Sequence, residues 1–277
     1  MHANCQGEVL LRMLGGHDEF VQAFDCRLFT NYIREPLPAD VLAGCDVFLY
    51  QYLGDEWGEL ASNRLLSQLG PKCVSLCIPN YFCRTYWPLE FNAGKNVLRD
   101  RLLEDIRKHR PTRKEFIHLA SRPSLLRHYD LQGIVERSLA HERGKEVRTP
   151  IKYLDRMISE GRKRRLFHTI NHPGVELLVD TANQILDQLG LDPSLVSDSL
   201  GPDDYYTALD LPVHPGLAEI FSLEWLDEKT TFNLYGYRVN YAQFVLIYSE
   251  YRDSGVDSFI KFMSRLHGRA NTGADSD

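Results

Sequence analysis

The chain has 277 residues, of which 43% are hydrophobic and 25% are charged, a composition typical of globular proteins. This length suffices for one large domain or two small ones. The longest apolar runs, such as YAQFVLIY at 241–248, are too short to span a bilayer. The chain does not open with a basic segment followed by an apolar stretch, so we predict no secretion signal and expect a cytoplasmic protein.

The net charge of −6 is unevenly distributed along the chain. Residues 99–165 contain 19 Lys and Arg against 10 Asp and Glu, whereas residues 174–235 contain 12 acidic residues and one basic residue, Lys229. A basic segment inside an acidic protein favours a local anionic partner over general nucleic-acid binding. Solvated helix faces are the alternative interpretation of the same charges.

All six cysteines lie in the first third of the chain: Cys5, Cys26, Cys45, Cys73, Cys77 and Cys83. They form no CxxC pair, so we predict no zinc site and no bound metal. Every cysteine except Cys5 is expected to be a buried, reduced thiol of an intracellular protein.

The first part of the chain alternates helices and strands. Apolar residues at 9, 10, 11, 13 and 14, followed by Gly15 and Gly16, predict a short helix over 5–14. Buried strands are predicted over 46–53 and 72–78, with a helix over 59–70 between them. This order implies parallel strands joined by crossover helices.

The rest of the chain is predicted to be largely helical. Periodic Leu, Ile and Val indicate helices through 97–160, and a strand over 164–170 then runs into a loop at 171–174. Further helices are expected over 175–190, after the Pro-bounded turn at 211–216, and at 241–268. We therefore predict an α/β fold with a parallel sheet core, as a single domain over 1–268 with a frayed tail at 269–277.

Three polar stretches fit the ends of strands. HANCQG at 2–7 enters the first predicted helix, YQYLGDEWG at 50–58 leaves the strand 46–53, and HTINHPG at 168–174 leaves the strand 164–170. In open α/β sheets, ligands bind beyond the carboxyl ends of the strands. A parallel sheet can bring such distant stretches together, so the sequence predicts a site at this edge.

Cys5 stands between Asn4 and Gln6 at the start of the first predicted helix. A helix N-terminus offers free N–H groups and the positive end of the dipole, which lower the pKa of a cysteine and can hold an oxyanion. The pattern therefore fits a nucleophile flanked by side-chain donors. A buried structural cysteine is the alternative, and the local sequence does not separate the two.

Three histidines are candidates for a general base. His172 lies in an Asn-His-Pro-Gly turn after a strand, whereas His168 lies within that strand and fits a hydrogen-bonded core histidine equally well. His214 repeats the His-Pro-Gly pattern, with a turn that starts a helix as the alternative. The sequence alone does not rank His172 above His214.

Two further stretches fit either binding or packing. The basic run GRKRR at 161–165 can bind phosphates, or it can be a solvated helix end. The segment 79–88 gathers four aromatic residues around Arg84, which suits a packed cluster in a core or a stacking platform for a sugar or adenine ring at a cleft.

Taken together, the motifs NCQG, DVFLYQYL, IPNYFCRTYWP and RRLFHTINHPG resemble, in this order, the WcbI family. This family is assigned to polysaccharide biosynthesis in bacterial capsule loci, with acetyltransferase as its expected activity. The resemblance extends from Asn4 to about Trp225 and implies layering of the Rossmann or SGNH type. The family pattern has a β-strand before the Asn-Cys-Gln turn, and three residues precede Asn4 here.

The resemblance implies coenzyme A or acetyl-coenzyme A as the ligand and a capsular sugar or its precursor as the O-acetyl acceptor. It places Asn4, Cys5 and Gln6 in the site, with Gln51 and His172 as neighbours. Taken with the residue patterns, the expected catalytic residues are Cys5, His172, Asn4 and Gln6. The expected coenzyme-binding residues are Gln51, Arg162, Lys163, Arg164, Arg165 and His214.

Other functions compete with this prediction. One is a cysteine-dependent carbohydrate esterase or deacetylase, and another is a non-catalytic protein that binds coenzyme A or a glycan. No nucleic-acid partner is expected, and any contact with membrane-bound capsule machinery should be peripheral.

Overall fold

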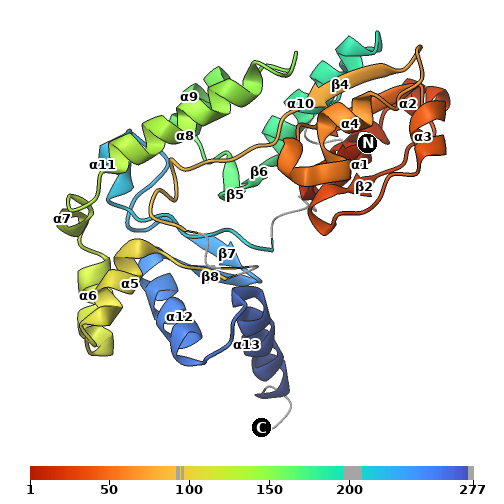
Figure 1. Ribbon diagram of the computed structural model, residues 1–277. Helices are drawn as coiled ribbons and strands as arrows, with labels where there is room; N and C mark the ends of the chain where they lie inside the picture. Colours follow the sequence, from red (N-terminus) through yellow and green to blue (C-terminus); the bar gives the residue numbers. More distant parts are fainter. Residues whose placement is uncertain (92–93, 95–96, 196–207, 274–277) are drawn as a thin grey trace. The chain divides into compact units, whose positions relative to one another are not determined.

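The computed structural model describes residues 1–91, 94, 97–195 and 208–273 (Figure 1). The chain forms two units, each assembled from three segments of the sequence. The first unit comprises Met1–Phe82, Leu139–Ser159 and Asn171–Tyr205, and the second comprises Cys83–Ser138, Glu160–Ile170 and Tyr206–Asp277. Because these segments interleave, neither unit is a continuous stretch of chain. The expectation of a single domain over 1–268 stays a prediction.

The first unit contains the predicted parallel sheet, with strands in the order β2-β1-β3-β4. Its strands are β1 (His2–Ala3), β2 (Phe29–Thr30), β3 (Val47–Gln51) and β4 (Val74–Ile78). Each neighbouring pair is parallel. The two residues before Asn4 thus form an inner strand, which presents the Asn-Cys-Gln turn at the carboxyl edge of the sheet. The α/β fold class is confirmed.

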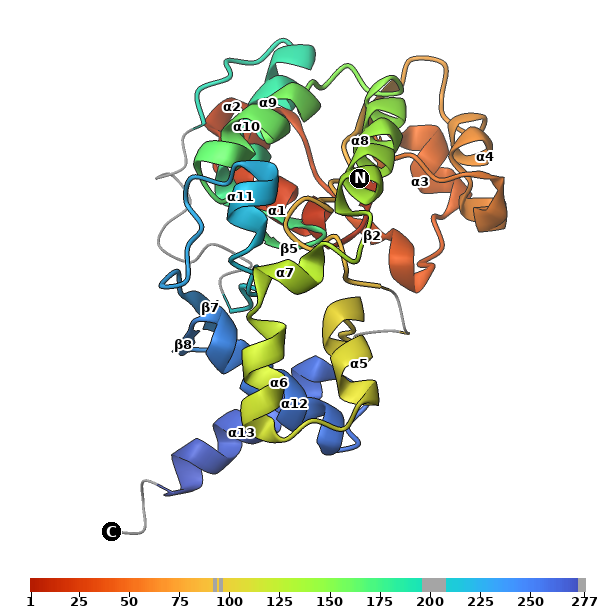
Figure 2. The ribbon, with the colours of Figure 1, turned by 90° about the vertical axis from the view of Figure 1, so that its left-hand side faces the viewer.

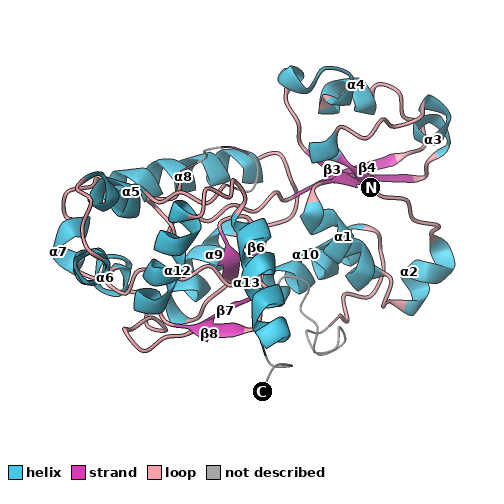
Figure 3. Cartoon of the chain, turned by 90° about the horizontal axis from the view of Figure 1, so that it is seen from below, coloured by secondary structure: helices cyan, strands magenta, loops and turns pink. Residues whose placement is uncertain are grey.

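Helices cover both faces of this sheet, as Figure 3 shows: α3 and α4 lie on one face, and α1 and α10 on the other. The helical segments of the unit are α1 (Cys5–Leu14), α2 (Asp18–Ala23), η1 (Asn31–Ile33), α3 (Ala39–Gly44), η2 (Asp55–Leu60), α4 (Ser62–Leu66) and α10 (Val175–Gln188). Side chains alternate along a strand. Phe48 packs on Leu42 of α3 and Leu65 of α4. Gln51, an odd number of residues further along β3, therefore faces the α1 side.

Helix α1 has the bounds that its sequence predicts. Asn4 caps its start and Gly15 follows its last residue. The apolar residues Val9, Leu10, Met13 and Leu14 are all buried. Burial of each such side chain contributes about 1.5–3 kcal/mol, so the packed face of α1 stabilises the position of the turn that precedes it.

The helix predicted over 59–70 is wrong in its bounds. A 3-10 segment, η2, ends at Leu60, and only Ser62–Leu66 form the α-helix α4. Gly58 adopts a positive φ of 62°, which is not helical, and the Leu53 N–H donates to Ser62 Oγ. Ala61, with φ −58° and ψ 135°, is not helical either, so the α-helix begins only at Ser62.

The expectation of five buried thiols is also wrong for three of the cysteines. Cys77 and Cys83 are buried, but Cys26 is exposed and Cys45 and Cys73 are half-buried. The Sγ atoms of Cys45 and Cys73 lie 3.4 Å apart. Both residues precede their strands, at the amino edge of the sheet.

The second unit is largely helical, as predicted for the middle and end of the chain. Its helices are α5 (Arg101–Lys108), α6 (Arg113–Ala120), α7 (Pro123–Leu126), α11 (Leu217–Phe221), α12 (Tyr241–Asp253) and α13 (Phe259–Gly273). Helices α8 (Leu131–Glu146) and α9 (Leu154–Lys163) contribute residues to both units. The short strands of the remaining chain are β5 (Phe167–Thr169), β6 (His172–Pro173), β7 (Phe232–Leu234) and β8 (Tyr237–Val239).

The tail predicted at 269–277 begins inside α13, which runs to Gly273, and residues 274–277 lie outside the described residues. Strands β7 and β8 form an antiparallel hairpin. Its two turn residues, Tyr235 and Gly236, both have positive φ, which matches the right-handed twist of the strands. Among the described residues, no helix is long and apolar enough to cross a bilayer.

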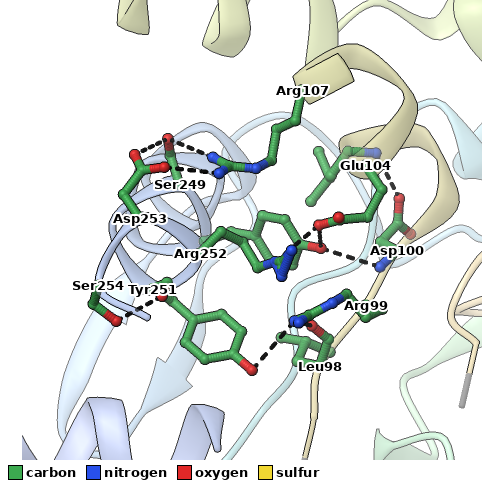
Figure 4. Close-up of polar contacts among 12 residues, drawn as sticks. Leu98, Arg99, Asp100, Glu104, Arg107, Ser249, Tyr251, Arg252, Asp253 and Ser254 are labelled. Carbon is green, nitrogen blue, oxygen red and sulfur yellow. Dashed lines mark hydrogen bonds and ion pairs between the residues drawn. The ribbon is translucent and has the colours of Figure 1, made fainter. Parts of the chain in front are cut away.

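Helices α5, α6 and α12 lie side by side in the second unit (Figure 2). Polar contacts join α5 to α12, as Figure 4 shows. Glu104 accepts hydrogen bonds from Tyr248 Oη at 2.5 Å and from Arg252 Nε at 3.0 Å. Arg107 pairs with Asp253 at 2.7 Å. These contacts set the register of the two helices in addition to their apolar packing.

Candidate functional site

Asn4 joins strand β1 to helix α1 and holds the turn between them. Its side-chain Oδ1 accepts a hydrogen bond from the Gln6 N–H at 2.9 Å, which caps the helix. Its own backbone N–H donates to Gln51 Oε1 at 2.8 Å. The turn is therefore held from its own helix and from the end of the neighbouring strand β3.

Cys5 is the first residue of α1 and lies beside a histidine. Its Sγ atom is 3.5 Å from His172 Nε2, a hydrogen-bond distance for sulfur. His172 is the first residue of β6, just ahead of helix α10, and both side chains are half-buried. A thiol at a helix N-terminus beside an imidazole is the arrangement of an activated cysteine nucleophile and its base. His172 is thus the histidine beside Cys5, the neighbour that the family resemblance implies, whereas the residue patterns alone left His172 and His214 open.

The Gln6 side chain is fully buried and ties three segments together. Its Nε2 donates to Tyr81 O at 3.1 Å and to Asn171 O at 2.8 Å. Its Oε1 accepts from the Tyr81 N–H at 3.1 Å and from Gln51 Nε2 at 3.2 Å. Since both amide hydrogens are bonded inside the protein, this geometry suits a residue that positions the Cys5 turn and His172.

Gln51 lies directly behind the turn and is also fully buried. Its Nε2 donates to Gln6 Oε1 and, at 2.9 Å, to Pro79 O, while its Oε1 accepts the Asn4 N–H. Leaving such a buried donor unpaired costs about 1–3 kcal/mol. Both Nε2 hydrogens are in use, so a hydrogen bond donated from Gln51 to coenzyme A would require one of these bonds to open.

Asn80 is part of the arrangement but was not among the predicted site residues. Asn4 Nδ2 donates to Asn80 Oδ1 at 3.2 Å, and Lys145 Nζ donates to the Asn80 carbonyl oxygen. Asn80 follows β4 and Pro79. A signal was present in the sequence, because Asn80 is a polar residue just beyond a predicted strand, like the other three polar stretches.

Lys145, near the end of α8, is paired with a buried carboxylate. Its Nζ lies 2.6 Å from Glu142 Oε1, and Tyr153 Oη donates to Glu142 Oε2 at 3.2 Å. Burial raises the pKa of Glu142, although Lys145 opposes that shift. For Lys145, whose charged form is a cation, burial lowers the pKa. The charge of Lys145 is therefore largely committed to Glu142.

The other two candidate histidines lie in the second unit. His214 is 6% exposed; its Nε2–H donates to Ala120 O at 2.9 Å and its Nδ1 accepts the Gly216 N–H at 2.9 Å. Burial lowers the pKa of His214 to about 4. His168 Nδ1 lies 2.5 Å from Asp210 Oδ1. The geometry of His214 fits the structural alternative, in which the side chain organises the turn before α11.

The basic run also belongs to the second unit, and carboxylates face three of its four members. Lys163 and Arg164 lie 3.6 Å and 3.2 Å from Glu160, and Arg165 lies 2.9 Å from Asp210. Burial tends to raise the pKa of Asp210, but the hydrogen bond from His168 and the charge of Arg165 outweigh it, so the pKa is lowered. The coenzyme contact predicted for Arg162, Lys163, Arg164 and Arg165 stays a prediction.

The aromatic segment at 79–88 serves mainly as packing. Tyr81, Tyr86 and Trp87 are all buried. The ring of Tyr86 makes edge contacts with Trp87, Phe167 and Trp225. The core interpretation of this segment therefore holds for these three residues.

A cavity of the first unit lies away from Cys5. It has a volume of about 440 Å³, and its lining includes Met1, Asp46 and Val47 at the amino ends of β1 and β3. None of the candidate catalytic residues lines it. We place the chemistry at the opposite edge, because the paired thiol and imidazole are there.

Comparisons with known proteins agree with the resemblance seen in the sequence. The model of one protein family, polysaccharide biosynthesis enzyme WcbI, matches residues 1–194. A solved structure shares the fold with a TM-score of 0.75 and 17% sequence identity, over 96% of this chain and 93% of its own. It is described as WcbI, a novel polysaccharide biosynthesis enzyme, in its native form without a disulfide bond between coenzyme A and one of its cysteines. No curated protein sequence matches the chain.

Proposed function

The chain belongs to the WcbI family of polysaccharide biosynthesis enzymes, and on this premise we propose that it is a coenzyme A-dependent O-acetyltransferase. Its proposed acceptor is a capsular polysaccharide or a sugar precursor. The observation that carries the proposal is the Cys5 Sγ atom 3.5 Å from His172 Nε2 at the N-terminus of α1. The description of the solved relative, which names coenzyme A and a cysteine, supports the choice of ligand.

In a covalent route, His172 takes the proton of Cys5 and the sulfur attacks the carbonyl carbon of the acetyl thioester. The carbon–sulfur bond to the coenzyme breaks, and the coenzyme leaves as a thiol with the proton from His172. His172 then accepts the proton of the sugar hydroxyl, whose oxygen attacks the acetyl group on Cys5. The ester forms and the Cys5 thiol is regenerated.

In a direct route, His172 deprotonates the sugar hydroxyl, which attacks the coenzyme thioester without an acetyl-enzyme intermediate. Acetyl-coenzyme A is already an activated thioester, so the covalent step is not required energetically. In both routes a tetrahedral intermediate carries a negative oxygen that needs hydrogen-bond donors.

Asn4 is the side chain we assign to that oxygen. Its Nδ2 donates one hydrogen to Asn80 Oδ1 and carries a second N–H. Gln6, also predicted to be catalytic, has both amide hydrogens bonded to backbone carbonyls. We therefore assign Gln6 a positioning role.

The same cysteine–histidine pair could also hydrolyse a sugar ester, which makes a carbohydrate esterase the second candidate. The two functions differ in their need for coenzyme A. One assay follows the free thiol released from acetyl-coenzyme A, with and without a capsular oligosaccharide that carries no acetyl groups. A second assay follows the acetate released from an acetylated oligosaccharide in the absence of coenzyme A. Acceptor-dependent thiol release supports transfer, and its loss in Cys5→Ala supports the covalent route. Acetate release without coenzyme, and no transfer, would support the esterase instead.

A further inference from the structure

The exposed guanidinium of Arg148 lies over the aromatic ring of Tyr52, beside the end of strand β3. Tyr52 directly follows Gln51, the last residue of β3, and its ring lies 4.6 Å from the Arg148 guanidinium carbon. Tyr52 is 39% exposed and Arg148 is exposed as well. Within the part of the chain that the structure describes, no carboxylate pairs with Arg148. Among the described residues, the guanidinium therefore contacts the Tyr52 ring and, through Nη1 at 3.5 Å, the Gly144 carbonyl oxygen, but no counterion.

The backbone on both sides of Arg148 is fastened to the carboxyl end of β4. Thr149 Oγ1 donates to the Cys77 carbonyl oxygen at 2.6 Å. Three residues before Arg148, Lys145 Nζ donates to the Asn80 carbonyl oxygen. Asn80 in turn accepts a hydrogen bond from Asn4. Arg148 is thus held at the same edge of the sheet as the turn that carries Cys5.

We propose that Arg148, held in place by the ring of Tyr52, binds a phosphate group of the coenzyme. This inference rests on the proposed function. A guanidinium presents two parallel N–H donors that match phosphate oxygens, and it is more weakly hydrated than an ammonium group. The stacking on Tyr52 restricts the side chain before the ligand arrives, which lowers the entropy cost of binding.

Other cations of the basic segment are less suited to this role. Lys145 is paired with the buried Glu142. Of the basic run, Arg164 faces Glu160 and Arg165 faces Asp210. A phosphate that bound these groups would have to compete with a carboxylate already in place. Arg148 carries no such cost.

A phosphate ester could come from two sources, because a sugar acceptor activated by a nucleoside diphosphate also carries phosphates. We assign the coenzyme, since a polysaccharide acceptor needs no phosphate at all. Calorimetric titrations with coenzyme A, with pantetheine, which has no phosphate, and with UDP-glucose distinguish these sources.

The variant Arg148→Met keeps the apolar stem that packs on Tyr52 and removes the charge. We expect it to bind coenzyme A about tenfold to a hundredfold more weakly, the usual loss for a charge-assisted hydrogen bond, and to bind pantetheine as the wild type does. Tyr52→Leu should weaken coenzyme A binding by less, whereas Tyr52→Phe, which keeps the ring, should bind normally. Arg143→Met is the matched control, since Arg143 is exposed on α8 but paired with Asp155 at 3.3 Å.

Unchanged coenzyme A affinity in Arg148→Met would overturn this inference and leave the proposed function standing. An equal loss for pantetheine, or a loss for UDP-glucose alone, would also overturn it. The triple variant of Lys163, Arg164 and Arg165 to Ala tests the basic run. A loss there with normal binding by Arg148→Met would assign the phosphates to the run instead. Wild-type protein that binds no coenzyme A would overturn the inference and the proposed function together.

Discussion

Cys5 Sγ lies 3.5 Å from His172 Nε2, although 167 residues separate the two in the chain. Cys5 opens helix α1, and His172 lies three residues before Val175, the first residue of α10. The two helices pack against each other on one face of the sheet. Their packing therefore brings two helix starts together and sets the distance between thiol and imidazole.

If transfer is covalent, replacing Cys5 with Ala should abolish it while leaving coenzyme A affinity nearly unchanged, because the lost thiol acts mainly in the transition state; if transfer is direct, the same change should cost only modestly. Activity is followed by thiol release and affinity by calorimetry. Intact mass spectrometry of wild-type protein after brief exposure to acetyl-coenzyme A separates the two routes: a mass increase of one acetyl group that is absent in Cys5→Ala supports the covalent route. Full activity in Cys5→Ala would show that the cysteine only packs.

Replacing His172 with Gln should slow alkylation of Cys5 by iodoacetamide at neutral pH, because the thiol loses the base that takes its proton. His214→Gln is the matched control, since His214 bonds to Ala120 and Gly216 in the second unit. The rate is measured by mass spectrometry of the peptide that contains Cys5. Equal alkylation rates in wild-type protein and His172→Gln would contradict the proposed pairing.

The two functions assigned to Asn4 can be separated by substitution. Asn4→Asp keeps the oxygen that accepts the Gln6 N–H but removes the Nδ2 donor. We expect this variant to lose about 10²–10³ in rate, as for other lost oxyanion donors. Its melting temperature should fall only modestly, since the helix cap remains while the bond from Nδ2 to Asn80 Oδ1 is lost. A large fall in melting temperature with normal activity would assign Asn4 to structure alone.

Gln51→Leu should destabilise the protein. The change removes three hydrogen bonds and leaves the buried Gln6 Oε1, Pro79 carbonyl and Asn4 N–H with fewer partners. Each unpaired buried group costs about 1–3 kcal/mol, so urea unfolding should show a clearly lower midpoint. Unchanged stability combined with weakened coenzyme A binding would instead support the coenzyme contact predicted for Gln51.

His214 predicts a pH dependence of stability. Burial lowers the pKa of His214 from 6.5 to about 4, so between these values the unfolded chain binds a proton that the folded chain does not. Through this residue, the free energy of unfolding is therefore highest above pH 6.5. It decreases by up to about 3 kcal/mol as the pH falls toward 4. Burial acts in the opposite direction on Glu90 and Asp100, whose pKa values it raises to about 7 and about 6.

Comparison with His214→Asn isolates the histidine from these carboxyl groups. The variant should be less stable at pH 7.5, because the bond to Ala120 O is lost. The gap between variant and wild type should shrink at pH 4.5, measured as the difference in urea midpoints. A gap that is constant across this pH range would contradict the shifted pKa.

The sequence by itself determined the local elements and the chemistry of the first turn. Apolar spacing between Asn4 and Gly15 predicted α1 with its observed bounds, because an N-cap and a glycine act within a few residues. The spacing at 175–190 predicted α10 nearly as well. The pattern of Asn4, Cys5 and Gln6 marked the turn, since the polar groups at the start of a helix come from the residues that form it.

The local residue patterns left open which histidine meets Cys5, and only the tertiary structure decided what the glutamines do. His172 and His214 both precede Pro-Gly, so their local sequences are alike, but one reaches the thiol and the other is enclosed between Ala120 and Gly216. Gln6 and Gln51 carry the same polar groups whether they face a ligand or each other. Their mutual hydrogen bond, across 45 residues of chain, forms because α1 packs on the face of β3 that bears Gln51. Such choices depend on contacts between distant segments, which spacing and composition within each segment do not encode.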